Sequence, residues 1–506
     1  NQGTVEVYKY DEKSRAWEHK QQLTPHNPET HAYFGGYDDG TGISISPDGG
    51  TCAIGAPSYG GSNATGAVYI FTRIGDTWRQ EAWIEPTGLV AGDTITWFGQ
   101  HVSVYKDFLV VGAWRDGSSD GVGSAAIYKR VGSKWTKKKH LIAQDHGASA
   151  GTYHFGRGVS VYENTIVISA AKENSYGTLY FFTTTDGGET WSLSQRLILP
   201  GSSNFGQGGR TLKLEKDILV VGEHLSNSTR GVVNILKPTS VGVYAYQTTV
   251  FPHNLDLSEL ENADYFGLQI DVDTSENGKN ITIASGGRKF DTNGIEEAGI
   301  GYIWESTDYG LNWTEGHSCV HDNIQAGDNF GYSAATSNGY TAFGAKNGNI
   351  PGSSLVDPGY VVTYRKGVNF PITAASVSIN NGLMPITYPL LKEKDRPIGF
   401  TSGSLQVSGS FSGYIMDDNG LDTKEFISSL FDDTIEILPL TIDMGGFAPS
   451  TNRLKFEMPK VTLVNPEISG GDIASFSVSF SAEDTQPLLS NDTDIVKLTY
   501  RSSSIT

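Results

Sequence analysis

The chain has 506 residues and a formal net charge of −19, with only 18% charged residues. This acidity argues against a surface that binds duplex nucleic acid, because phosphate binding requires clustered Lys and Arg. No segment approaches the roughly 20 consecutive apolar residues of a membrane-spanning helix, so we expect no membrane span. The 61 Gly residues, with abundant Ser, Thr and aromatic residues, favour many short strands joined by tight turns.

Cysteine usage and catalytic motifs give no support to an enzyme. Only Cys52 and Cys319 are present, and the repeats described below place them in different structural units. Two isolated thiols indicate neither a disulfide framework nor a zinc site. No Gly-x-Ser-x-Gly motif, phosphate loop or His-Glu-x-x-His motif occurs.

Phe-Gly pairs recur six times in the first two thirds of the chain, at intervals of 50 to 64 residues. Each pair opens an alternating strand, which is followed by an apolar strand that ends in Gly-Ala or a variant. A Gly-x-Val-Tyr-like strand and a strand with an early Trp come next. An interval of this size fits a four-stranded unit. The pairs are Phe34-Gly35, Phe98-Gly99, Phe155-Gly156, Phe205-Gly206, Phe266-Gly267 and Phe330-Gly331.

Such units cannot bury their sheet faces alone, so they must pack radially on their neighbours. We therefore predict an all-β chain with a β-propeller over residues 1–366. The N-terminal residues 3–17 read as the third and fourth strands of a blade whose first two are missing. This predicts seven blades with an incomplete first blade, or six as the alternative. We expect the missing half upstream of Asn1 or elsewhere in the chain.

The order of motifs resembles the FG-GAP repeats of integrin α-subunit propellers, although "VISAAK" and "VVGEHL" depart from Gly-Ala-Pro. Integrin-like propellers often bind calcium between their first two strands. Here only Asp271, Asp273, Ser275 and Asn277 place alternate oxygen ligands before a Gly. Because no bidentate acid closes this loop, we favour an ordinary polar hairpin. Calcium is the one cofactor to test, and none is expected to be required.

Two segments fit the pattern Ser/Thr-x-Asp-x-Gly-x-x-Trp and resemble the Asp-box turns of sialidases and other propellers. The first contains Asp186 and Trp191, and the second contains Asp308 and Trp313. In those folds the Asp accepts backbone N–H bonds and the Trp packs on the turn. The box lies away from the sialidase active site, so it argues for the fold and not for catalysis.

Residues 367–506 form a different domain, in which Trp and the Phe-Gly spacing disappear. Alternating strands with a single helix near 421–433 predict an antiparallel β-sandwich or barrel. The segments "VSINNGLMPI", "RPIGFTSGSLQVSGSFSGYIMDD" and "LKFEMPKVTLVNPEISGGDIASFSVSFSAED" resemble the tail tube proteins of tailed bacteriophages.

That resemblance implies copies of the chain in rings or stacked tubes, next to other virion tail proteins. DNA would pass the lumen without adhering, because an acidic wall repels phosphate. The candidate lumen residues are Asp417, Asp418, Asp432, Asp433, Glu436 and Asp472.

Three functions follow from these patterns. The first is a structural virion protein of a tailed bacteriophage, a ring-forming tube subunit with the propeller as outer decoration or host- and glycan-binding module. The alternative is a secreted or cell-surface adhesion protein of integrin-α type, located outside the cell. A glycan-processing propeller enzyme rests on the Asp boxes alone, and we expect no enzyme.

Overall fold

The chain divides into two compact units, Asn1–Lys366 and Gly367–Thr506. The computed structural model describes residues 3–11, 16–37, 42–61, 65–87, 96–117, 121–148, 151, 153–175, 177–199, 209–224, 231–252, 265–275, 277–292, 294–314, 316–321, 324–349, 359–365, 372–380, 384–386, 399–401, 406–414, 437–445, 453–469, 475–482 and 497–501. Within these ranges the chain is all-β, and its only helical segments are the short 3-10 turns η2 (Ala143–His146) and η3 (Glu173–Ser175). In the same ranges no helix has the length and apolar character needed to cross a membrane.

The described residues of the first unit form seven antiparallel sheets, five of four strands, one of three and one of two. In chain order, with semicolons between sheets, the strands are β1 (Val5–Asp11) and β2 (Ala16–Leu23); β3 (Ile43–Ile45), β4 (Thr51–Ala56), β5 (Ala67–Ile74) and β6 (Thr77–Ile84); β7 (His101–Tyr105), β8 (Phe108–Ala113), β9 (Ser124–Val131) and β10 (Lys134–Leu141); β11 (Phe155–Tyr162), β12 (Thr165–Ala170), β13 (Thr178–Thr183) and β14 (Ser192–Ile198); β15 (Leu212–Glu215), β16 (Ile218–Glu223), β17 (Val232–Ser240) and β18 (Val243–Val250); β19 (Ile270–Thr274), β20 (Ile281–Gly287), β21 (Ile300–Ser306) and β22 (His317–Cys319); and β23 (Phe330–Ser337), β24 (Tyr340–Ala345) and β25 (Tyr360–Arg365).

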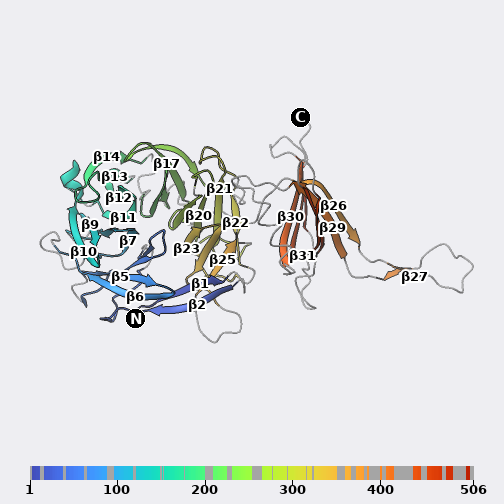
Figure 1. The fold of residues 1–506 in the computed structure, drawn as a ribbon, viewed down its shortest axis with the longest axis horizontal. Coiled ribbons are helices and arrows are strands. Elements are labelled where there is room, and N and C mark those ends of the chain that lie inside the picture. The colour runs from blue at the N-terminus through green and yellow to red at the C-terminus, as the bar shows by residue number, and fades with distance from the viewer. Residues whose placement is uncertain are drawn as a thin grey trace, which may run out of the picture. The chain divides into compact units, whose positions relative to one another are not determined.

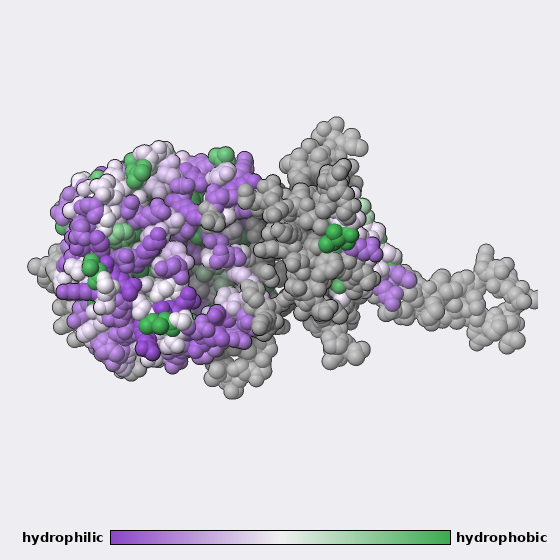
Figure 2. Space-filling view, viewed as in Figure 1, coloured by the Kyte–Doolittle hydropathy of each residue, from purple (hydrophilic) through white to green (hydrophobic). Residues whose placement is uncertain are grey.

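Each sheet is built from consecutive strands, and Figure 1 shows the sheets side by side around a centre. The second strand of each four-stranded sheet is the most apolar, because neighbouring sheets cover both of its faces. Every residue of β4 and β12 is buried, for example. The fourth strands carry charge, as in the Lys-rich β10. In the view of Figure 2 the surface of this unit is accordingly mostly hydrophilic, with isolated hydrophobic residues.

Neighbouring sheets approach each other closely at pairs of glycines, one from each sheet. A Cβ atom added to Gly55 of β4 would lie 1.7 Å from the carbonyl oxygen of Gly99, which begins the next sheet. The same approach joins Gly112 to Gly156, at 2.0 Å. A side chain at these positions would collide with backbone, so only glycine fits. Two further pairs, Gly222 with Gly267 and Gly286 with Gly331, repeat the contact at 1.8 Å.

The fifth sheet departs from the predicted spacing. Phe205 and Gly206, predicted as the fourth pair, lie outside the described residues. Gly209 instead takes the glycine's role, because its N–H donates to the Gly222 carbonyl at 3.0 Å, as Gly99 donates to Gly112 at 3.1 Å. The preceding sheet has Ser169 in place of the second-strand glycine, and its hydroxyl donates to the Gly209 carbonyl at 2.5 Å. Between the fourth and fifth sheets, this hydrogen bond replaces the contact between a glycine Cα and a carbonyl oxygen.

The second unit contains one six-stranded sheet and one two-stranded sheet within the described residues. Alternate side chains of the large sheet form a buried cluster that includes Phe411, Met458 and Phe480. The opposite face carries serines in register, such as Ser410 opposite Ser479. The strands are β26 (Ile372–Asn380), β27 (Met384–Ile386), β28 (Gly399–Thr401), β29 (Gln406–Tyr414), β30 (Ile437–Gly445), β31 (Arg453–Ser469), β32 (Ser475–Ala482) and β33 (Lys497–Arg501).

Several predictions for this unit fall outside the described ranges. They are the helix near 421–433 and the candidate lumen residues Asp417, Asp418, Asp432, Asp433, Glu436 and Asp472. The sandwich or barrel also stays a prediction, because a single large sheet is what the described strands form.

We expect Gly55→Ala to destabilise the first unit by about 1–3 kcal/mol or more, because the new methyl group meets an immovable carbonyl. Gly50→Ala is the matched control, since its Cβ would come no closer than 3.4 Å to another atom. All 9 Trp residues lie before residue 314, so Trp fluorescence during thermal unfolding reports this unit alone. Equal unfolding midpoints for the two variants would contradict the role of the glycine contact.

Candidate functional site

The residue before each described Phe-Gly pair has a left-handed backbone. Its φ is 55° for Tyr33, 57° for Trp97, 54° for His154, 59° for Tyr265 and 55° for Asn329. Bulky residues seldom adopt this conformation, and such outliers gather at functional sites. Because the pairs begin equivalent strands, these five residues lie at the same end of their sheets.

We call this end of the first unit the FG rim. It consists of aromatic and cationic side chains beside the Phe-Gly pairs and just after the second strands. Its members are Tyr33, Tyr37, Trp97, Trp114, Arg115, His154, Arg157, Arg210, His224, Tyr265, Arg288, Tyr332 and Lys346.

Five of these rings form a continuous chain across three sheets. Tyr33 and Tyr37 have ring centroids 4.4 Å apart, and Tyr37 lies 5.0 Å from Trp97. Trp97 lies 5.6 Å from Trp114, which lies 4.6 Å from His154. Except for His154, these rings are half-buried or exposed, so their faces are partly open to a ligand.

Guanidinium groups stack on this aromatic chain. The guanidinium carbon of Arg157 lies 4.0 Å from the Trp114 ring centroid. Arg115 lies 5.5 Å from the Trp97 ring and 5.4 Å from the Trp114 ring. The Trp114 indole N–H donates to the Gln100 side chain, which fixes the ring that both cations share. These are cation–π contacts at ordinary distances.

A second group repeats the arrangement on the last two sheets. Arg288 lies 5.2 Å from the Tyr265 ring and 5.0 Å from the Tyr332 ring. The Nζ atom of Lys346 lies 4.6 Å from the centroid of the same Tyr332 ring. Arg288 is half-buried, and its Nε has no hydrogen-bond partner among the described residues. The Nε–H of Arg288 is thus a buried donor without an acceptor among the described residues.

His101 connects the two groups. It is buried, and burial together with the nearby Arg157 and Arg210 holds the pKa of His101 well below its ordinary value. Arg210 in turn lies 3.2 Å from the Nε2 atom of His224. A neutral His101 adds no further charge beside these two cations.

Two described carboxylates that adjoin the rim in sequence are buried. Asp116 follows Arg115 directly, is fully buried and accepts a hydrogen bond from the Ser124 hydroxyl at 2.6 Å. Glu223 precedes His224, is 2% exposed and accepts one from the Asn234 amide at 2.8 Å. These two carboxylates are therefore paired inside the fold, on a chain whose net charge is −19.

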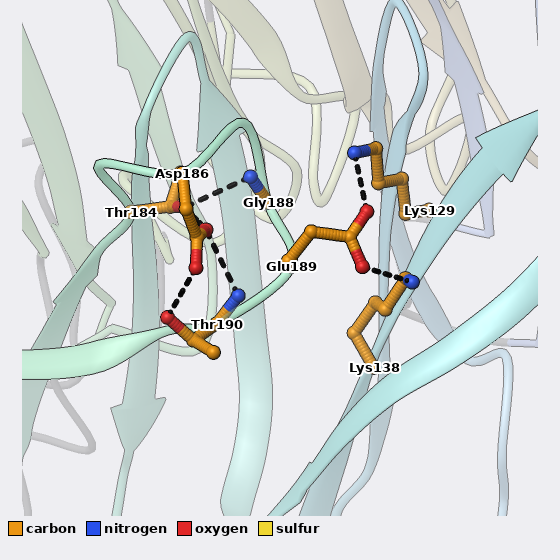
Figure 3. A network of polar contacts seen from close by, with 7 residues as sticks. All are labelled: Lys129, Lys138, Thr184, Asp186, Gly188, Glu189 and Thr190. Atoms are coloured by element: carbon orange, nitrogen blue, oxygen red, sulfur yellow. Dashed lines mark hydrogen bonds and ion pairs between the residues drawn. The ribbon is translucent and has the colours of Figure 1, made fainter.

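Both Asp boxes form tight turns at the opposite end of their sheets. Asp186 accepts hydrogen bonds from Thr184 Oγ1 at 2.8 Å and from the Thr190 N–H at 2.9 Å and hydroxyl at 2.6 Å (Figure 3). These bonds, the Thr190 hydroxyl first, hold the pKa of Asp186 far below its ordinary value. Asp308 is held in the same way by Ser306 and Asn312.

The first Asp box also ties its sheet to the preceding one. Glu189, between Asp186 and Trp191, lies 2.7 Å from Lys129 Nζ and 2.6 Å from Lys138 Nζ (Figure 3). Trp191 is buried, with its ring 5.4 Å from that of Phe108. Trp313 is partly buried beside the core of the sixth sheet. These turns brace the fold far from the FG rim, so they take no part in the candidate site.

The four residues of the predicted calcium loop are divided between a strand and a turn. Asp271 and Asp273 belong to β19, and their carboxylates accept the backbone N–H of Thr336 at 2.9 Å and Asn338 at 2.8 Å. Ser275 and Asn277 lie in the following turn and bond to each other at 2.8 Å. Among described residues, no three of His, Cys, Asp or Glu lie where they could hold a metal ion. Calcium binding stays a prediction.

Asp271 accepts a backbone hydrogen bond that serine accepts in other sheets. At four junctions between sheets, a side-chain oxygen of one first strand accepts an N–H from the first strand of the next sheet, and these bonds form a ladder around the centre. Between β15 and β19 the equivalent residue is Lys213, whose Nζ atom lies 3.3 Å from the Asp271 carboxylate. The serine bonds run from Val104 to Ser44 at 3.1 Å, from Val161 to Ser103 at 3.1 Å and from Leu214 to Ser160 at 3.0 Å. The carboxylates are thus part of the ring's construction.

Comparisons with known proteins bear on the first unit. Residues 78–128 match the family model described as FG-GAP repeat. The match begins in β6 and ends in β9, and it covers about a tenth of the chain. The first unit is a β-propeller that contains an FG-GAP repeat, as its motifs predict. No curated protein matches the chain.

Among solved structures, the chain is similar to TolB from Acinetobacter baumannii. The identity is 12%, the alignment covers 55% of this chain and 57% of the TolB chain, and the TM-score is 0.29. The aligned part thus spans little more than half of the TolB chain.

Sequence reasoning placed the repeat glycines but did not find the FG rim. Trp114, Arg157 and Arg288 come from sheets far apart in the sequence, so no local motif joins them. The available signal was the Tyr, Trp or His that stands before four of the Phe-Gly pairs, at Tyr33, Trp97, His154 and Tyr265.

We expect Asp271→Ser to retain the stability of the first unit to within about 1 kcal/mol, because serine supplies the same acceptor elsewhere. Asp271→Ala should cost about 1–3 kcal/mol, since the buried Thr336 would lose its N–H acceptor. Denaturant unfolding followed by Trp fluorescence measures both. Calcium or a chelator should leave the midpoints unchanged. A calcium-dependent midpoint that Asp271→Ser abolishes would contradict this and favour the calcium loop.

Proposed function

We propose that this protein is a non-catalytic binding protein whose FG rim takes an anionic carbohydrate. The observation that carries the proposal is the stacking of cations on partly open aromatic rings. Arg157 and Arg115 stack on Trp114, and Arg288 lies over Tyr265 and Tyr332. Binding proteins recognise ligands through such aromatic surfaces with a few fixed polar groups.

The chemistry of the rim favours a sugar acid over a neutral sugar. A guanidinium group binds a carboxylate through two parallel hydrogen bonds, and a stacked guanidinium is already oriented for this. The aromatic faces suit the flat apolar faces of sugar rings. On a chain of net charge −19, the cations of the rim also supply the local attraction that an anionic ligand needs.

In this proposal the propeller has seven blades, one for each sheet of the first unit. The contact between the first and last sheets supports it, because the rings of Tyr10 and Tyr340 lie 4.9 Å apart. Gly3 supports it as well, since its Cβ would lie 2.2 Å from the Phe34 carbonyl oxygen, as that of Gly66 would from Phe98 at 2.1 Å. The β1–β2 pair is then the outer half of a blade.

The second unit is proposed to assemble copies of the chain, as its resemblance to tail tube proteins implies. The six-stranded antiparallel sheet supports this, because its end strands among the described residues, β26, β30 and β33, can pair between subunits. The protein would then be a structural component of a tailed-phage virion that presents a glycan-binding propeller. A cell-surface adhesion protein would use the same rim without ring assembly.

Arg288→Gln should weaken binding of an acidic oligosaccharide about tenfold or more, because a charge-assisted pair is lost. Oligogalacturonate, alginate oligosaccharides and sialyllactose are titrated into the full chain, and the fluorescence of the rim Trp residues is followed. Arg288→Lys should lose part of the affinity, since it keeps the charge but not the planar fork.

Arg79→Gln is the matched control for this titration, because Arg79 is exposed on the outer strand β6. It should bind like the unaltered protein. Neutral galactose oligosaccharides should bind at least tenfold more weakly than the acidic ones. Absence of binding to every acidic oligosaccharide, or equal binding by the Arg288 and Arg79 variants, would reject the proposed site.

Assembly is tested by negative-stain electron microscopy and mass photometry of the full chain. We expect rings or stacked tubes, and Ile379→Lys should disperse them, because Ile379 is 49% exposed on the end strand β26. Ile74→Lys, a change at the 64% exposed residue of β5, should leave assembly intact. Monodisperse monomers of the unaltered chain would favour the adhesion protein over the tube subunit.

A further inference from the structure

Among the described residues, the first sheet has only the two strands that correspond to the outer half of a four-stranded sheet. Within the described residues, β1 pairs only with β2, whereas the corresponding β5 pairs with both β4 and β6. The pair nevertheless has the outer position of an ordinary blade. Gln21 exchanges two hydrogen bonds with the backbone of Trp78, both at 2.8 Å, as Gln195 does with Tyr244 between two complete sheets.

Apolar residues of the second sheet are exposed where that inner half would lie. Ile43 and Ile45 of β3 are 42% and 55% exposed. The equivalent residues of β7, Val102 and Val104, are each 3% exposed and pack in one cluster with Ala53 of the preceding sheet. The exposure of Ile43 and Ile45 therefore marks the absence of a preceding inner strand pair.

The seventh sheet has the complementary exposed surface. Val361 of β25 is 68% exposed, although the equivalent Val68 of β5 and Ala125 of β9 are at most 1% exposed. The side-chain acceptor of the ladder is also absent from β23, as it is from β15 at Lys213. The residue of β23 that corresponds to Ser103 is Ala335, which has no side-chain acceptor for a following strand.

We infer that Ile43, Ile45, Ala335 and Val361 form an acceptor surface for a partner β-hairpin with the chemistry of this propeller's own first two strands. The first strand of that hairpin would begin with Phe-Gly and carry Ser or Asp five residues after the Phe, to accept the Ile45 N–H as Ser44 accepts that of Val104. Its second strand would end in Gly-Ala, so that its backbone can approach Gly35. Binding would complete the first blade and bury Ile43 and Ile45 on one side of it and Val361 on the other.

The chain itself supplies the probe for this inference. A synthetic peptide of residues 98–113 contains Phe98, Ser103 and Gly112 and no Trp. Added to the full chain, it should raise the thermal midpoint measured by Trp fluorescence, and the rise should grow with peptide concentration. Hydrogen exchange at the Ile45 amide should slow at least tenfold. A peptide with Gly112→Val should do neither, because its second strand is held away from Gly35.

Ile45→Lys in the full chain should abolish the peptide's effect, and Ile74→Lys, at an exposed residue of β5, should retain it. This inference rests on the seven-blade arrangement proposed above and not on carbohydrate binding. The acidic oligosaccharide titration is therefore repeated on Ile45→Lys, where retained binding shows that the propeller is intact. No midpoint shift and no change in exchange with the unaltered chain, or equal peptide effects on both lysine variants, would overturn the acceptor surface.

Discussion

At four junctions between sheets of the propeller, one sheet approaches the next until a glycine Cα faces a backbone carbonyl oxygen. This contact between Gly55 and Gly99, and between their equivalents, fixes the distance between sheets near their inner edge. It also forces the turn before the second glycine, because the Phe-Gly segment must bend sharply to bring its carbonyl into place. The left-handed residue before each described Phe-Gly pair lies in that bend. The aromatic side chains of the FG rim are thus placed by the same contact that closes the ring.

The two ends of the sheets differ in the interactions that their side chains make. At one end the Asp boxes saturate their carboxylates with local hydrogen bonds, and Glu189 joins two sheets through Lys129 and Lys138 (Figure 3). Near the centre the Ser and Asp ladder links consecutive first strands. These features hold the sheets rigidly, so the rim at the other end can carry strained backbone and closely spaced cations. A preorganised surface of this kind loses little entropy when a ligand binds.

The repeat was predictable because its glycines have no substitute at the sheet-to-sheet contact, so their spacing survives in the sequence. At the one exception, the Ser169 hydroxyl contacts the Gly209 carbonyl, and Gly209 does not directly follow a Phe in the sequence. The role of Asp271 was not predictable, because its N–H donor belongs to a strand 65 residues away. The FG rim was not predictable either, because its contacts also join residues far apart in the sequence.

Residues that touch across sheets, such as Arg288 and Tyr332, share no local pattern. In the second unit the alternation of apolar and serine residues predicted strands correctly for β26, β29 and β32, because period-two patterning reflects burial on one face. Pairing order depends on contacts that such patterning does not encode.

The central claim is that a ring built by glycine contacts presents a cationic aromatic rim to an acidic sugar. An experimental structure of the full chain with bound oligogalacturonate tests it most directly. The account predicts density for the oligosaccharide along the FG rim, with a sugar ring against Trp97 or Trp114 and a carboxylate at the guanidinium of Arg288. Density at the Asp-box end, or a rim left empty while the sugar binds elsewhere, would contradict it.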